Sequence, residues 1–301
     1  MSKTLGGFKK VFAVAVSAAT LVGSACMFTA CSNSFPEIRM TLSFNGETYT
    51  LNYKLYRDYY TQTVDHYMAL IDEDYFDNTV IHDYQSDRMI GGGYTYMVDG
   101  QVDTENADTI DDLTALDYDG LTLAEDGAIK VIETTVWKND VATNRLHGET
   151  TSNGHSIEGG SGLTNSYGSL GTYTYVTKDL TPGDTYNVTY KNTDSDARGS
   201  SPYYKNSVTS LFYVYTSSSS TTDSNYCVFG TLADDESKTA LDDLLAAIDA
   251  YLEDSELESD DFTEEDTLDI ADEFVDGGTY EVTYNVPVKP IVIKEVRVTK
   301  Y

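Results

Sequence analysis

Four histidines and a short run of glycines are the residues whose types could support catalysis or ligand binding. His66, His82, His147 and His155 could act as metal ligands or general bases, but none has a partner at a recognised ligand spacing such as H-E-x-x-H. The glycines at 91–93 lack the following Lys and Ser/Thr of a phosphate-binding loop, and the chain contains no G-x-S-x-G nucleophile elbow. We therefore expect neither a metal nor a cofactor.

The stretch 75–93 has a more informative pattern of aromatic, charged and glycine residues. An aromatic-Asp pair at 76–77 is followed by His82, Asp83, Arg88, Met89 and the glycines. This order resembles the centre of the cyclophilin-type peptidyl-prolyl cis-trans isomerases, which reads F-Y-D-G-x-x-F-H-R-x-x-x-x-F-M-x-Q-G-G-D. The resemblance predicts two neighbouring strands joined by a turn.

Other segments match the same family in its own chain order. They are 41–56 (the first two strands), 63–70 (T-V-x-N-F-x-x-L), 148–154 (G-E-F-x-S-N-G), 168–170 (the start of G-x-L-S-M-A), 210–214 (S-Q-F-F-I), 226–230 (H-V-V-F-G) and 290–298 (the last strand). Because several motifs in one order are more specific than any single motif, we expect a cyclophilin-like domain over 38–301.

The resemblance also implies which residues occupy the catalytic groove. Asp83 stands at the position of the family's catalytic arginine, and Tyr226 stands at the position of its late histidine. The remaining groove positions correspond to His82, Arg88, Met89, Gly91, Leu211, Phe212 and Tyr213. Among these, Arg88 replaces the phenylalanine of the proline pocket, Gly91 replaces a glutamine, and His82 matches a structural histidine.

Two of these substitutions could compensate for each other. In the family fold, the positions of Asp83 and Arg88 face one groove from neighbouring strands. A carboxylate and a guanidinium in a partly dry groove satisfy each other's hydrogen bonds. We therefore predict that Asp83 and Arg88 form an ion pair.

The N-terminal 30 residues have the pattern of a secretory signal. Lys3, Lys9 and Lys10 precede an apolar run over 11–29, and the sequence Phe-Thr-Ala-Cys ending at Cys31 resembles a bacterial lipobox. We expect residues 1–30 to be a lipoprotein signal peptide, Cys31 to carry lipid, and residues 31–37 to be a tether. The weaker alternatives are cleavage before Cys26 and an uncut membrane helix.

Charge narrows the set of partners. Removal of the three lysines in 1–30 changes the net charge from −31 to −34. Nucleic acid is excluded as a partner, because its binding depends on Lys and Arg. The same charge repels anionic headgroups, so lipid on Cys31 must provide the membrane attachment.

Cys227 is then the second of two cysteines in the mature chain, and we expect it to be buried and unreactive.

Hydrophobic periodicity predicts the elements that would position the site. Val64, Tyr67, Met68 and Ile71 recur at helical spacing, and a second amphipathic helix is expected over 238–252. Residues 48–56 and 292–298 alternate as half-buried strands. We predict a mainly β fold with two helices: a cyclophilin-like closed antiparallel β-barrel with inserted strands and loops.

Three intervals match nothing in the family and are expected to be insertions, at about 94–146, 173–206 and 253–276. The first contains a strand-like run at 129–137, and the second contains alternating tyrosines and valines around a turn at 181–184. The third has 13 acidic and no basic residues in 24 positions. We expect it to be an exposed excursion with little role in the core, because crowded carboxylates repel one another.

These patterns lead to two hypotheses for function. The first is a lipid-anchored prolyl isomerase outside the cytoplasm of a bacterium, weak or inactive because Asp83 replaces the arginine, that acts on proteins with exposed X-Pro segments. The second is a lipid-anchored, non-catalytic protein that binds a peptide or a surface partner. Sequence leaves the client and the oligomeric state open.

Overall fold

The protein is described by a computed structural model that covers residues 34–107, 112–115, 148–160, 162–173, 185–191, 198–204, 208, 210–270 and 280–301. Residues Asn33–Tyr301 form one compact unit. The predicted signal peptide, Cys31 and the strand-like run at 129–137 lie outside the described residues. No helix in the described ranges has the length and apolar character needed to cross a bilayer.

Most of the described elements are strands. In chain order they are β1 (Glu37–Phe44), β2 (Glu47–Leu55), α1 (Thr61–Asp72), β3 (Thr79–Tyr84), β4 (Arg88–Gly91), β5 (Tyr94–Val98), β6 (Gln101–Val102), β7 (Leu113–Ala115), η3 (Thr151–Asn153) and β8 (Leu170–Thr172). They continue with β9 (Thr185–Lys191), β10 (Arg198–Tyr204), β11 (Phe212–Tyr215), β12 (Val228–Leu232), α3 (Asp235–Asp254), η4 (Ser259–Phe262), β13 (Thr263–Ile270), β14 (Tyr280–Pro287) and β15 (Val292–Lys300).

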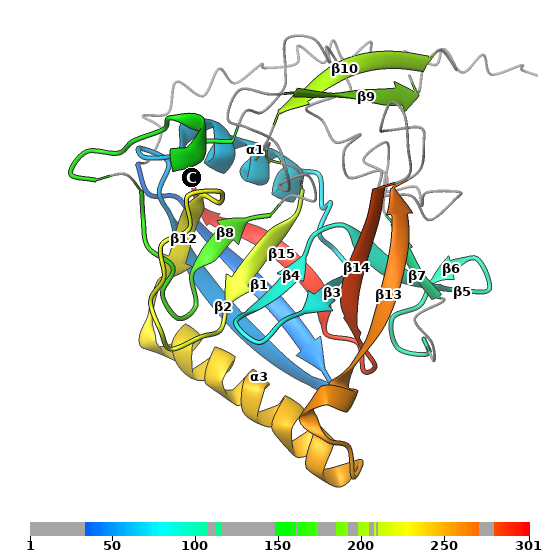
Figure 1. Cartoon of the computed structure of the whole chain (residues 1–301). Helices are drawn as coiled ribbons and strands as arrows, with labels where there is room; N and C mark the ends of the chain where they lie inside the picture. The colour runs from blue at the N-terminus through cyan, green and yellow to red at the C-terminus, as the bar shows by residue number, and fades with distance from the viewer. Residues whose placement is uncertain are drawn as a thin grey trace, which may run out of the picture. The chain divides into compact units, whose positions relative to one another are not determined.

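Eight strands close into an antiparallel barrel in the order β1-β15-β3-β4-β11-β8-β12-β2 (Figure 1). The first hairpin shows how local sequence sets the register. Asn45 and Gly46 both have positive φ, at 49° and 86°, as a two-residue hairpin turn requires. Alternate residues of β1 are then buried, from Ile38 to Phe44, while their neighbours face outward. The predicted closed antiparallel barrel is confirmed.

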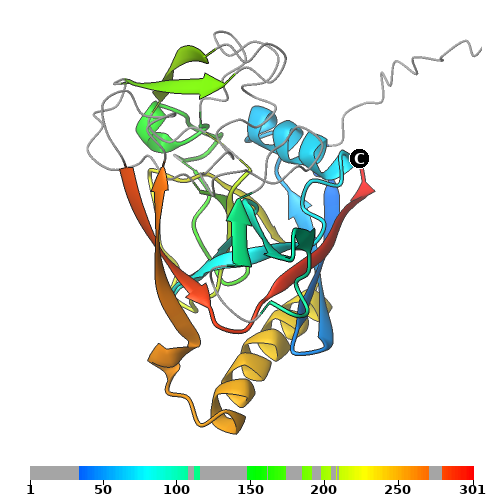
Figure 2. The same ribbon diagram turned by 90° about the vertical axis from the view of Figure 1, so that its right-hand side faces the viewer.

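The two predicted helices are present at opposite ends of the barrel (Figures 1 and 2). The apolar face of α1 is buried as predicted. The side chain of Tyr60, the N-cap residue of α1, accepts no hydrogen bond from the first turn. Glu149, which lies on a distant loop, accepts one from the N–H of Thr63 at 2.8 Å instead. The helix α3 begins three residues before the predicted start, because Asp234 caps it by accepting from the N–H of Ser237 at 2.7 Å.

The barrel interior is filled with aromatic and aliphatic side chains. Tyr67 of α1 stacks on Phe229 with ring centroids 4.5 Å apart, and Phe76 meets Phe212 edge-on at 5.7 Å. On the other side, the apolar stripe of α3 packs on β2, with Leu241 and Leu244 fully buried. The two helices therefore complete a core that the barrel alone would leave open at its ends.

The described acidic insertion is largely exposed, as composition predicted, but it also contributes one aromatic residue to the core. Its described part completes α3, forms η4 and becomes β13, which pairs with β14 in an antiparallel hairpin that extends to Pro287. Phe262 is only 2% exposed and contacts Phe44 and Tyr84 edge-on. Only the expectation of little role in the core is at odds with the structure, because one buried aromatic residue anchors the tract, a contribution that the average acidity of the segment conceals.

The other insertions also contain strands. In the first, β5 pairs with β6 and β7 in a small sheet. In the second, β9 pairs with the strand that follows it, β10. The sequence predicted strands on either side of a turn at 181–184. The strand expected after that turn is present as β9, whose partner β10 follows it in the chain, and residues 174–184 lie outside the described part.

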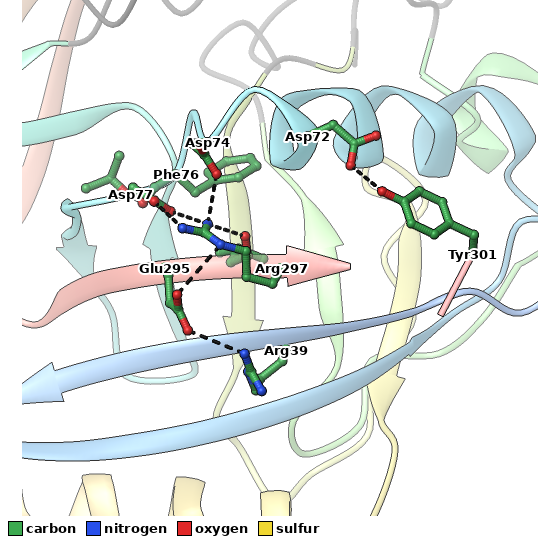
Figure 3. Close-up of polar contacts among 10 residues, drawn as sticks. Arg39, Asp72, Asp74, Phe76, Asp77, Glu295, Arg297 and Tyr301 are labelled. Carbon is green, nitrogen blue, oxygen red and sulfur yellow. Dashed lines mark hydrogen bonds and ion pairs between the residues drawn. The ribbon is translucent and has the colours of Figure 1, made fainter. Parts of the chain in front are cut away.

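A polar network ties the last strand to the loop after α1 (Figure 3). Arg297 donates two hydrogen bonds to Asp77, at 2.7 and 2.6 Å, and lies 3.2 Å from a carboxylate oxygen of Asp74. Glu295 extends the network to Arg39 at 3.6 Å. These contacts hold β15 beside the loop that leads into β3, the strand that carries Asp83.

Candidate functional site

The hairpin of β3 and β4 separates the predicted groove residues onto different faces. Met89 lies in the barrel core, together with Phe212. A Cβ on Gly91 would lie 3.1 Å from side-chain atoms of Ile81 and Ile293, so Gly91 also faces the core. Because side chains alternate along a strand, Arg88 lies on the other face. Three predicted groove positions, Met89, Gly91 and Phe212, therefore contribute to packing inside the barrel.

Arg88 lies against a group of aromatic residues outside the barrel core. We call this group the Arg88 cluster; it consists of Arg88, Ile90, Tyr173, Tyr213, Tyr215 and Tyr226. The guanidinium carbon of Arg88 is 4.8 Å from the ring centroid of Tyr213, 5.7 Å from that of Tyr226 and 5.9 Å from that of Tyr215. These distances allow cation–π attraction. The cluster brings together the predicted residues Arg88, Tyr213 and Tyr226.

The aromatic rings are held by contacts from neighbouring strands. Tyr173, which follows β8, stacks on Tyr226 at 5.5 Å, and the hydroxyl of Tyr213 donates to Asn165 at 2.7 Å. Gly171 on β8 allows the Tyr213 ring to approach, since a Cβ there would lie 2.2 Å from the ring. The cluster is therefore a preformed feature of three adjacent strands.

The charge of Arg88 is neutralised by its chain neighbour. Its Nε and Nη2 atoms donate to the two carboxylate oxygens of Asp87, both at 2.9 Å. These hydrogen bonds lower the pKa of Asp87 below its usual range. The predicted Asp83–Arg88 ion pair is thus wrong, because the adjacent carboxylate of Asp87 binds Nε and Nη2 of the guanidinium in bidentate geometry.

Asp83 has different partners and is 1% exposed. One carboxylate oxygen accepts from Nε2 of Gln85 at 2.7 Å, and the other accepts from the backbone N–H of Asn285 at 3.1 Å. Burial raises the pKa of Asp83, while the hydrogen bonds from Asn285 and Gln85 and the charge of Arg88 oppose the rise. Asn285 belongs to β14, so the β13–β14 hairpin covers the position of the family's arginine.

Asp83 and the Arg88 cluster nevertheless share one electrostatic environment. Burial raises the pKa of Tyr173, the interactions with Tyr226 and Asp83 raise it further, and Arg88 opposes them. Asp83 and the Arg88 cluster therefore interact electrostatically through Tyr173, although Asp83 and Arg88 are not bonded to each other.

The remaining predicted residues have structural contacts. His82 is fully buried between Tyr94 and Tyr284, with ring centroids 4.5 and 5.2 Å away. Burial lowers the pKa of His82 to about 3, so the imidazole is neutral near pH 7. Leu211 is buried, and its carbonyl accepts a hydrogen bond from the hydroxyl of Tyr67.

In the part of the chain that is described, neither the thiol nor a metal-ligand cluster offers another candidate site. Cys227 is 1% exposed, and burial raises the pKa of its thiol well above the usual range. Such a thiol is a poor nucleophile. Across the described ranges, no three His, Cys, Asp or Glu side chains gather as they would around a metal ion.

Sequence reasoning missed several members of the site. Tyr215 lies two residues after Tyr213, so strand alternation alone could have placed it on the same face. Asp87 adjoins Arg88 and was also available as a partner. Asn285 could not be found in this way, because it is 202 residues from Asp83 in the chain.

Comparisons with known proteins agree with this barrel. The model of the family described as cyclophilin type peptidyl-prolyl cis-trans isomerase/CLD matches residues 39–261. No curated protein is similar enough to this chain to count as a match.

Solved structures of a cyclophilin type peptidyl-prolyl cis-trans isomerase from Cryptosporidium parvum are also similar. One has 14% identity and a TM-score of 0.41, and covers 89% of this chain and 99% of its own. A second, determined in the presence of the dipeptide Ala-Pro, has 13% identity and a TM-score of 0.40, with 88% and 99% covered. The family model matches well over half of the residues of this chain. This chain therefore belongs to the cyclophilin-type peptidyl-prolyl cis-trans isomerase family.

Proposed function

We propose that this protein is a cyclophilin-type isomerase whose prolyl isomerase activity is weak or absent. Rotation of an X-Pro bond must cross a barrier of roughly 18–20 kcal/mol, and a catalyst needs a hydrogen-bond donor that favours the twisted amide. The resemblance assigns this role to an arginine. The single observation that carries the proposal is that Asp83, at that position, is 1% exposed and already accepts from Asn285 and Gln85.

The occupant of the expected proline pocket supports the same proposal. The Arg88 side chain is 13% exposed and lies over Tyr213, where the resemblance predicts room for a proline ring. A proline ring could enter only if the guanidinium left both the aromatic ring and Asp87. That displacement would cost the charge-assisted hydrogen bonds and the cation–π contact together.

We further propose a lipid anchor on Cys31 and a location on the outer face of a bacterial cell membrane. The support is the basic start of the chain, the apolar run over 11–29 and the Phe-Thr-Ala-Cys sequence. One cysteine that carries two or three acyl chains is sufficient for stable attachment, since each buried methylene contributes about 0.8 kcal/mol.

A second candidate function is non-catalytic binding of a peptide or a surface partner. Tyr173 and Tyr226 are only partly buried, and their rings are stacked at the edge of the Arg88 cluster. Partly exposed tyrosines provide an apolar surface with a polar tip, which suits peptide recognition. A peptide could contact this edge without displacing Arg88.

A protease-free isomerisation assay on a short Ala-Pro peptide tests the proposal. We expect the wild type to stay near the uncatalysed rate and the double variant Asp83→Arg/Arg88→Phe to recover part of the family's activity. Asp83→Arg alone should destabilise the protein, because it places a second cation beside Arg88. Arg39→Phe, on the exposed face of β1, is the matched control and should leave the isomerisation rate unchanged.

Two results separate the candidate functions. Wild-type turnover comparable to that of an ordinary cyclophilin would refute the proposed loss of activity. Saturable binding of the same peptide without turnover, weakened by Tyr226→Ala, would support the second candidate.

A further inference from the structure

The folded part of the chain begins very close to the proposed anchor. The carbonyl of Ser34 accepts a hydrogen bond from the N–H of Asp58 at 3.4 Å, and the carbonyl of Pro36 accepts from Leu55 at 2.8 Å. Only two residues separate Ser34 from Cys31. Three peptide steps of 3.8 Å span at most about 11 Å. A lipid on Cys31 would therefore keep Ser34 within about that distance of the lipid's attachment point.

Aromatic side chains surround this attachment point. Phe35 meets Tyr56 edge-on with centroids 5.8 Å apart, and Tyr56 stacks on Tyr59 at 5.9 Å. The ammonium of Lys54 lies 4.1 Å from the centroid of the Phe35 ring. All four side chains are partly exposed. We call these four residues the tether face.

The composition of the tether face suits the boundary between headgroups and acyl chains. Tyrosine rings are amphipathic and concentrate at this depth, and a lysine can bury its stem while its ammonium reaches the phosphates. We propose that the tether face of this protein docks on the bilayer that holds Cys31, so that the domain has one fixed orientation on the membrane. The inference rests on the proposed lipid anchor.

The distribution of charge supports this orientation. The strand β1 runs from Glu37, beside the tether face, to Phe44, whose ring meets Tyr251 of α3. Eight residues of strand span roughly 26 Å. The acidic side chains in the C-terminal turns of α3, such as Asp249 and Glu253, would then lie far from the bilayer. Since a strongly negative chain is repelled by anionic lipids, this arrangement places the carboxylates of the C-terminal turns of α3 where repulsion is weakest, whereas its N-terminal end, where Asp234 accepts a hydrogen bond from Asn52, lies nearer the tether face.

Depth-dependent fluorescence quenching tests the docking. The mature chain from Cys31, which contains the whole compact unit, is coupled through Cys31 to a maleimide lipid in vesicles of phosphatidylcholine and phosphatidylglycerol. Buried Cys227 should not compete for the maleimide. In a Trp137→Phe background, one variant carries Tyr59→Trp on the tether face, and a matched variant carries Ala250→Trp at an exposed position of α3.

Brominated lipids should quench the tryptophan of Tyr59→Trp several-fold more strongly than that of Ala250→Trp. Adding Phe35→Ser should reduce the difference, whereas Tyr251→Ser should not. Equal quenching of the two tryptophans would overturn the docking and leave the anchor intact. Mass spectrometry that finds unmodified Cys31 in the native protein would refute the anchor, and with it the docking, while leaving the isomerase proposal unaffected.

Discussion

Phe262 anchors the acidic segment between α3 and the last strands, so its truncation should destabilise the whole domain. The residue ends η4, immediately before β13, and is 2% exposed. Its ring centroid lies 5.0 Å from that of Tyr84, 6.2 Å from Phe44 and 6.5 Å from Tyr251. Phe262→Ala would remove the ring from among all three neighbours at once.

The expected cost follows from this burial. A buried Phe→Ala substitution typically lowers the free energy of unfolding by about 3–5 kcal/mol, through lost burial and the cavity that remains. Each edge-on aromatic pair adds roughly 0.5–1.5 kcal/mol beyond area burial. We expect a loss near the middle of the range, about 4 kcal/mol, because η4 can collapse only partly onto the rigid barrel.

Urea denaturation followed by circular dichroism measures this change. The midpoint should fall while the slope with urea stays constant, since the surface exposed on unfolding hardly changes. The matched control is Glu264→Ala, two residues further on at an exposed position, which should shift stability by less than about 0.5 kcal/mol. If Phe262→Ala costs less than about 1 kcal/mol, the tract is the dispensable excursion that its composition suggested.

Two further substitutions probe the charged groups. Burial raises the pKa of Asp83, so the native state holds the proton of this carboxyl more readily than the unfolded state does. The contribution of Asp83 to stability is therefore fully present below its pKa in the unfolded chain. That contribution is lost as pH rises through the raised pKa of the native state. The stability of Asp83→Asn relative to wild type should therefore increase as pH rises from about 3 to about 7, as measured by thermal unfolding. A difference between the two proteins that stays constant with pH would contradict the raised pKa. Arg297→Gln removes the paired hydrogen bonds to Asp77 and should lower the free energy of unfolding by roughly 1 kcal/mol, since both side chains are partly exposed. This loss should shrink in about 1 M salt. An unchanged midpoint of thermal unfolding in low salt would show that the pair contributes nothing to stability.

The sequence alone determined the elements whose signals are local. The tight turn at Asn45 and Gly46, the alternation in β2 and the stripe of α1 all depend on residues within a few positions of one another. The order of short motifs then indicated the barrel, because each motif corresponds to a strand or helix at a fixed place in that fold.

The tertiary structure alone decided the contacts of the site. Strand alternation and a shift of register between Ile81 and Asp83 determine which side chains of β3 and β4 face the core, and one residue of shift reverses the faces. Asp83 could not be assigned to Asn285 from sequence, because the barrel and the β13–β14 hairpin bring together strands that are distant in the chain. The buried ring of Phe262 likewise outweighs the acidic composition around it, since the free energy of burial depends on the neighbours that the fold supplies.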